Sequence, residues 1–155
     1  MIQKIITQQT KEGREMLSYK ADPVDLENLS YLRDLSADLI DTAKSCTNPT
    51  AAGLAAHQIG HPVRAFAIKW GSRYRVLFNP EIIEASEKKA PFCESCLSRP
   101  ARPGIWTKRH KTIRLRFYEL GESGFPRFFA STEKFKKLDA IVVQHELDHL
   151  NGILI

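Results

Sequence analysis

The sequence lacks any long apolar run and contains few cysteines, and both features narrow the class of protein. No stretch of about 18 consecutive apolar residues occurs among its 155 residues, so we expect no membrane-spanning helix. The first residues, up to Leu17, contain no apolar segment of the secretory type, so we expect a cytoplasmic protein. Three cysteines, Cys46, Cys93 and Cys96, are too few and odd in number for a disulfide framework. We therefore expect reduced thiols, some of which are metal ligands.

Acidic residues are absent from one long segment, between Glu94 and Glu119. Its basic residues are Arg99, Arg102, Lys108, Arg109, Lys111, Arg114 and Arg116. The net charge of the whole chain, +5, is too small to indicate a nucleic-acid-binding protein by itself. The simpler interpretation of the basic stretch 99–116 is a solvated face of strands and loops. The alternative is a surface that contacts polyanions such as ribosomal RNA.

Length and composition fit one α+β domain that covers residues 1–155. Hydrophobic residues make up 43% of the chain and charged residues 26%, as in globular proteins with a single core. The sequence shows neither an internal repeat nor an obvious linker. We expect this domain to be a monomer.

Apolar periodicity predicts a helix early in the chain and several strands after it. Residues 24–46 repeat apolar side chains at three- and four-residue steps, and Asn48-Pro49 should end that helix. Strands are predicted at 63–69, at 73–78 and at 113–118. We expect Asn79-Pro80 to end the second strand, and residues 125–130 to pair with the third as a hairpin.

The last helix is the most clearly predicted element. Ser131 or Thr132 should cap its start, and Gly152 should end it. Its apolar and histidine side chains share one face, namely Leu138, Ile141, Val142, His145 and His149. The three residues that follow Gly152 are apolar and are predicted to form a short strand.

His145, Glu146 and His149 match the pattern H-E-x-x-H on this helix. Residues four apart are about 400° apart around an α-helix, so both imidazoles point the same way and can bind one metal ion. Glu146 lies next to the first ligand and can reach a water molecule on the metal. None of the six residues after His149 is a ligand type, so a third ligand must come from upstream, with Cys93 and Cys96 the best candidates.

Two other interpretations of these residues stay open. Cys93, Cys96, His145 and His149 form a closed Cys₂His₂ set, which would be a structural zinc site without an open position. Alternatively, the helix belongs to a zinc peptidase that cuts ordinary peptide bonds. The closed site leaves Glu146 without a purpose, and a cysteine ligand from upstream argues against the peptidase.

Three motifs make the sequence similar to the peptide deformylase family. AAGLAAHQ at 51–58 resembles the family's G-Φ-G-Φ-A-A-x-Q, and ESCLS at 94–98 resembles E-G-C-L-S. QHELDHL at 144–150 matches Q-H-E-x-D-H-L at every position. Their order and spacing extend the resemblance over essentially the whole chain. It implies an α+β domain in which antiparallel sheets surround a central helix with the H-E-x-x-H residues.

The resemblance implies a metal-dependent hydrolase that removes the formyl group from N-terminal formyl-methionine of newly made polypeptides and releases formate. The metal ligands would be Cys96, His145 and His149. The metal would be one divalent ion, with Fe²⁺ expected in the cell and Zn²⁺, Ni²⁺ or Co²⁺ as substitutes. Glu146 would be the general acid/base. Gln58 and the backbone N–H of Leu97 would stabilise the oxyanion.

The resemblance also implies where the substrate binds. The backbone of Ala52 and Gly53 would pair with the peptide as an added strand. The methionine pocket would be lined by Phe92, Leu138, Ile141 and Val142, with Glu94 near its rim. Nascent chains would be the partners. In the alternative interpretation of its charge, the basic stretch 99–116 guides the enzyme to the ribosome.

The sequence departs from the family pattern at a few positions. Ser95 replaces a glycine beside Cys96, where its side chain would crowd the substrate or add a hydrogen bond. Ala51 replaces the first glycine of the first motif, which should stiffen that loop. His57 occupies a variable position, and we expect it at the surface. Bacterial members usually continue with a further helix, whereas this sequence ends at Ile155.

Overall fold

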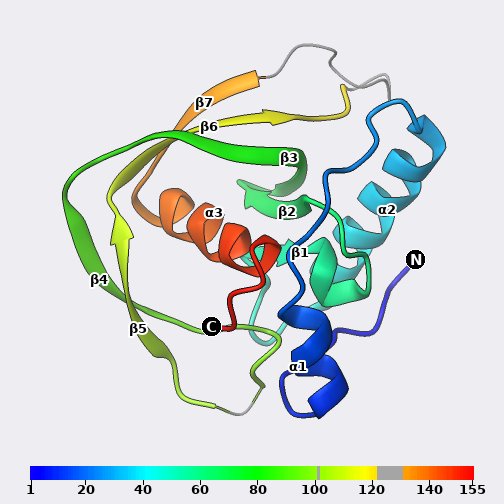
Figure 1. Cartoon of the computed structure of the whole chain (residues 1–155), viewed down its shortest axis with the longest axis horizontal. Coiled ribbons are helices and arrows are strands. Elements are labelled where there is room, and N and C mark those ends of the chain that lie inside the picture. The colour runs from blue at the N-terminus through cyan, green and yellow to red at the C-terminus, as the bar shows by residue number, and fades with distance from the viewer. Residues whose placement is uncertain (101, 122–130) are drawn as a thin grey trace.

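Two antiparallel sheets and three α-helices make up the described part of the chain, which comprises residues 1–100, 102–121 and 131–155 of a computed structural model (Figure 1). The helices are α1 (Lys11–Leu17), α2 (Leu29–Ser45) and α3 (Lys137–Leu150), with a 3₁₀ turn, η1, at Ala56–Ile59. The strands are β1 (Gly53–Ala55), β2 (Ala65–Trp70), β3 (Arg73–Ala85), β4 (Lys89–Glu94), β5 (Ile105–His110), β6 (Thr112–Tyr118) and β7 (Ser131–Lys136). No helix among the described residues is long and apolar enough to cross a membrane.

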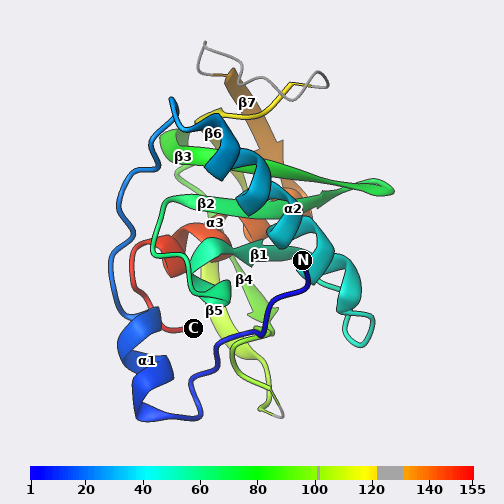
Figure 2. The ribbon, with the colours of Figure 1, turned by 90° about the vertical axis from the view of Figure 1, so that its right-hand side faces the viewer.

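The larger sheet has the order β1-β2-β3-β6-β7, and β4 and β5 form a separate two-stranded sheet. Helices α2 and α3 pack on opposite faces of the larger sheet (Figure 2). Strand β2 shows this directly, because Ala65 and Ala67 contact the α2 side whereas Phe66 and Ile68 contact the α3 side. Helix α3 is also in contact with β5, so it lies between the two sheets.

The predicted first helix is present but shorter than expected. It begins at Leu29, because the Asn28 side chain caps it by accepting a hydrogen bond from the backbone N–H of Tyr31 at 3.2 Å. It ends at Ser45, before the predicted Asn48-Pro49 stop. The predicted strand at 63–69 corresponds to β2, which begins two residues later.

The expectation that Asn79-Pro80 ends a strand is wrong. Strand β3 continues to Ala85 through a shift in register between Phe78 and Glu81. Asn79 has a φ of 47°, a left-handed conformation that asparagine tolerates. Its side chain bonds to both the N–H and the C=O of Val24, at 2.8 and 3.0 Å. The bulge therefore accommodates the proline without ending the strand.

The segment before the last helix also differs from the prediction. The strand at 113–118 is confirmed as β6, but its predicted partner, 125–130, lies outside the described residues. The structure pairs β6 with β7, so Ser131 and Thr132 belong to a strand and do not cap a helix. Helix α3 begins at Lys137 and ends before Gly152, which has the expected positive φ of 73°. Residues 153–155 form no strand.

Candidate active site

Helix α3 and the segment after β4 bring three potential metal ligands together. The His145 and His149 rings lie 5.1 Å apart, one turn apart on the same side of the helix. The Sγ atom of Cys96 lies 3.1 Å from Nε2 of His149. One ligand atom from each of the three residues falls within 4.8 Å of the others. These are the three residues that the family resemblance implies as ligands.

The environment of His149 suits a metal ligand. Burial lowers the pKa of His149 to about 3, so the imidazole is neutral, as a metal ligand must be. His145 is buried too, but hydrogen bonds with Cys96 and Glu94 raise its pKa to about 10. Metal binding at His145 therefore requires the loss of a proton, because a ligand imidazole must be neutral. A thiolate with two imidazoles is a donor set that suits Zn²⁺ or Fe²⁺, and three protein ligands leave a position open.

Glu94 was expected near the rim of the methionine pocket, but its main contacts are with His145 and Arg109. It contributes to the cavity wall, but its side chain is buried and accepts a hydrogen bond from His145 Nδ1 at 2.9 Å. Arg109 donates to both carboxylate oxygens, at 2.6 and 2.8 Å. Burial by itself would raise the pKa of Glu94, but the bonds from Arg109 and His145 lower it to about 2. The carboxylate therefore fixes the ring so that Nε2 is left for a metal.

Arg109 was expected among the surface cations, and that expectation is wrong. Its guanidinium is buried between Glu94 and Asp148, whose Oδ2 accepts from Nη1 at 2.6 Å. The side chain of Arg109 is on the inward face of β5, in register with the inward-facing Ala90 of β4.

Cys93 lies apart from the ligand cluster. It is exposed, and the alternation of β4 points it away from the face of Phe92 and Glu94. Its cross-strand neighbour is the exposed Trp106. Among the described residues the metal-ligating group contains Cys96 without Cys93. The structure thus gives no support to a closed Cys₂His₂ site.

Glu146 is fully buried beside the ligands and next to Gly53. Its Oε2 atom has no hydrogen-bond partner, an unusual state for a buried carboxylate unless a water or ion belongs there. Burial raises the pKa of Glu146 to about 7, in the range that suits a general base. A Cβ atom at Gly53 would lie 2.4 Å from Oε1 of Glu146. The second glycine of the first motif is therefore required to make room for this carboxylate.

Gln58 and Leu97 present N–H groups near the ligands. The amide oxygen of Gln58 accepts from the backbone N–H of Ala55 at 2.8 Å, which fixes its orientation. Its Nε2 then points to Ser98 Oγ at 3.0 Å and to Cys96 Sγ at 3.8 Å. Within the described part of the chain, the backbone N–H of Leu97 has no acceptor.

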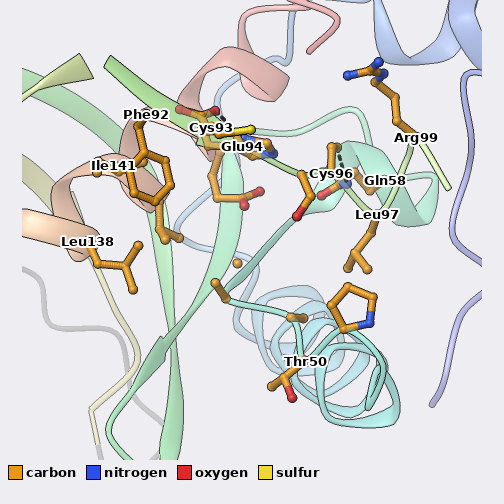
Figure 3. Close-up of a pocket in the computed structure, with 18 of the residues that line it drawn as sticks. Thr50, Gln58, Phe92, Cys93, Glu94, Cys96, Leu97, Arg99, Leu138 and Ile141 are labelled. Carbon is orange, nitrogen blue, oxygen red and sulfur yellow. Dashed lines mark hydrogen bonds and ion pairs between the residues drawn. The ribbon is translucent and has the colours of Figure 1, made fainter. Parts of the chain in front are cut away.

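A cavity of about 660 Å³ opens over this cluster (Figure 3). All the predicted substrate-binding residues line it, namely Ala52, Gly53, Phe92, Glu94, Ser95, Leu138, Ile141 and Val142. Strand β1 is at the edge of its sheet, and no described strand pairs with its free side. The cavity also has a wall that the sequence did not predict, which includes Arg99 and Arg102.

The sequence led us to expect His57 at the surface, and that expectation is wrong. It is only 3% exposed, and its ring meets that of Tyr19 edge-on at 6.3 Å. Burial lowers its pKa, so it is a neutral core residue. It does not belong to the group of three ligands.

Comparison with known proteins identifies the family of the chain. A family model described as polypeptide deformylase matches residues 2–155. The chain belongs to the polypeptide deformylase family. It is 36% identical over 147 residues to a peptide deformylase of Dictyoglomus thermophilum, covering 94% of this chain and 87% of that protein. It is 39% identical over 145 residues to one of Heliobacterium modesticaldum, covering 93% and 87%.

Solved structures agree with this assignment. The deformylase of Thermotoga maritima superposes with a TM-score of 0.81 at 28% identity, covering 99% of this chain and 95% of that one. A Met-Ala-Ser-bound class I type b deformylase of Acinetobacter baumannii gives a TM-score of 0.81 at 25% identity, covering 99% and 96%. The small α+β fold with antiparallel sheets is therefore confirmed.

The predicted activity is confirmed as well. This deformylase is a metal-dependent hydrolase of protein biosynthesis that removes the formyl group from the formyl-methionine of newly made polypeptides. The alternatives of a purely structural zinc protein and of an ordinary zinc peptidase are set aside.

Proposed function

We propose that Cys96, His145 and His149 hold one divalent metal ion, Fe²⁺ in the cell, and that Glu146 performs the proton transfers of deformylation. One observation carries this proposal: the three ligand atoms lie within 4.8 Å of one another, beside a buried carboxylate with an unpaired oxygen. In the same proposal α3 is the central catalytic helix, and residues 1–155 act as one domain in a cytoplasmic monomer.

The residues around the metal position have different roles in the reaction. A divalent metal supplies Lewis acidity, which lowers the pKa of a water molecule and makes the formyl carbon more electrophilic. Glu146 takes a proton from water as its oxygen bonds to the formyl carbon. Gln58 Nε2 and the Leu97 N–H donate to the formyl oxygen as its negative charge develops. Glu146 then gives the proton to the amine nitrogen as the C–N bond breaks, so formate and a free amino terminus leave.

The cavity places the peptide by its backbone and by its first side chain. The free edge of β1 offers the backbone of Ala52 and Gly53 to an added strand. Figure 3 shows Phe92, Leu138 and Ile141 grouped at one end of the cavity. We assign this apolar end, which Val142 completes, to the methionine side chain.

The apolar pocket makes a prediction about the first residue of the substrate. Formyl-norleucine peptides, in which CH₂ replaces sulfur, should react nearly as well as formyl-methionine peptides. Formyl-glycine peptides should lose about 1.5–3 kcal/mol of transition-state binding, because they bury no side chain. The measurement is kcat/KM for the three peptides, which otherwise have the same sequence. Equal values for glycine and methionine would refute the pocket assignment.

The ribosome is the partner we propose for Lys108 and Lys111, two exposed residues of the basic stretch. Arg109 is buried, and Arg114 and Arg116 are paired with acids of β3. Lys108 and Lys111 are exposed, and neither has an ion pair within the described residues.

Charge reversal tests the ribosome proposal. The double variant Lys108→Glu/Lys111→Glu should weaken co-sedimentation with ribosomes, and higher salt should weaken it for the unaltered protein. Hydrolysis of small formyl peptides should not change, because neither lysine lines the cavity. If the unaltered protein does not co-sediment even at low salt, these lysines are an ordinary solvated face.

A further inference from the structure

The far wall of the cavity carries two arginines that the catalytic residues do not use. Arg99 and Arg102 both line the cavity, on the segment that follows Cys96 and Leu97. Figure 3 shows Arg99 beyond Leu97, on the opposite side from Phe92, Leu138 and Ile141. Within the described chain neither guanidinium has an ion pair or hydrogen bond. Their charges are therefore available to a molecule in the cavity.

The negative charges of the cavity do not balance these arginines. Its acidic lining residues are Glu94 and Glu146. Both are buried, with 5% and 3% of their surface exposed, and Glu94 is already bonded to Arg109 and His145. Asn48 and Thr50, which also line the cavity, are exposed and uncharged. Among the described residues that line the cavity, the charges that are not buried are therefore positive.

The proposed function leads the rest of a bound peptide past these arginines. The proposed function places the first side chain at the apolar end and the formyl group at the ligand cluster. The rest of the peptide then leaves along the free edge of β1, over the wall that includes Leu97 and Arg99. An extended chain advances about 3.3–3.6 Å per residue, so the second and third residues lie within about 10 Å of the cluster.

We propose that Arg99 and Arg102 make this deformylase prefer substrates with acidic side chains directly after the formyl-methionine. The preference rests on the proposed function, since it concerns the same cavity. An arginine offers several N–H donors to a carboxylate, whereas a lysine side chain of the substrate would be repelled. Because the interaction is far from the reacting carbon, it should change KM more than kcat.

Three peptide amides test the preference: formyl-Met-Asp-Asp, formyl-Met-Asn-Asn and formyl-Met-Lys-Lys. The amide removes the terminal carboxylate, so the peptides differ in their side chains alone, and Asn matches Asp in size without its charge. We expect kcat/KM to decrease in that order, with about a tenfold difference between the Asp and Lys peptides at low salt. The difference should nearly vanish at 1 M salt, where the screening length is about 3 Å.

Charge-reversal variants show whether the two arginines cause the preference. Arg99→Glu/Arg102→Glu should invert the order so that the Lys peptide is best, and Arg99→Lys/Arg102→Lys should keep the original order. The matched control is Lys44→Glu/Lys134→Glu, which changes the net charge equally at exposed positions outside the cavity. That control should keep the original order.

Two results would overturn the inference. One is equal kcat/KM for the three peptides at low salt; the other is a control variant that inverts the order as the arginine variant does. A metal-loaded protein that releases formate from none of the peptides would instead contradict the proposed function. In that case titration calorimetry with the unformylated peptide amides still tests the preference. The inference predicts a lower Kd for Met-Asp-Asp than for Met-Lys-Lys.

Discussion

Replacing Glu146 by Gln is expected to leave a folded protein that binds one metal ion per chain but loses at least about 10²-fold in kcat. The amide keeps the size and hydrogen bonding of the side chain but cannot accept the proton from water. Glu146 is not a member of the ligand group, so metal content should stay at one per chain. Burial raises the pKa of this carboxyl to about 7, which makes it a stronger base than an exposed glutamate.

The matched control is Asp139→Asn, the same change of carboxylate to amide in the first turn of α3. Asp139 does not line the cavity, so this variant should retain nearly full activity. Metal content has to be measured on the same samples. A Glu146→Gln protein with full metal and unaltered formate release would contradict the role proposed for this residue.

Loss of Cys96 is expected to have the second large effect. Cys96→Ala removes the only sulfur of the ligand group that the described residues form, and a two-histidine site binds metal far more weakly. Both the bound metal and the formate release should therefore be lost. Metal analysis after dialysis, together with a formate assay, measures this.

Cys93→Ala is the natural partner experiment, because the two cysteines are three residues apart and both line the cavity, but only Cys96 belongs to the ligand group of the described residues. Cys93 is exposed on the outer face of β4, so its removal should leave one metal per chain and most of the activity. If both variants lose metal equally, the closed Cys₂His₂ site is the better description.

The ligand cluster could be predicted from the sequence because it depends mostly on local geometry. His145, Glu146 and His149 lie within a single helical turn, and their spacing fixes their directions. The sequence left Cys93 and Cys96 as the best candidates for the third ligand. The resemblance of the motif ESCLS to the family pattern then favoured Cys96. The tertiary structure was needed to show that Cys93 points outward.

Features that depend on the pairing of strands far apart in the sequence could not be predicted from local spacing. Arg109 is adjacent in sequence to Lys108 and close to Lys111, yet strand alternation buries it against Glu94 and Asp148. Ser131 and Thr132 are good helix caps by type, but pairing with β6 extends the strand to Lys136. His57 lies in a motif position that any residue type can fill, so nothing in the sequence indicated its burial.

Formate release from formyl-Met-Ala-Ser, measured together with iron content on anaerobically loaded protein, tests the central claim most directly. We predict that formate release rises in proportion to bound iron, up to one ion per chain, and that chelation abolishes it until metal is restored. A natively folded protein with one bound iron per chain and no formate release would contradict the account.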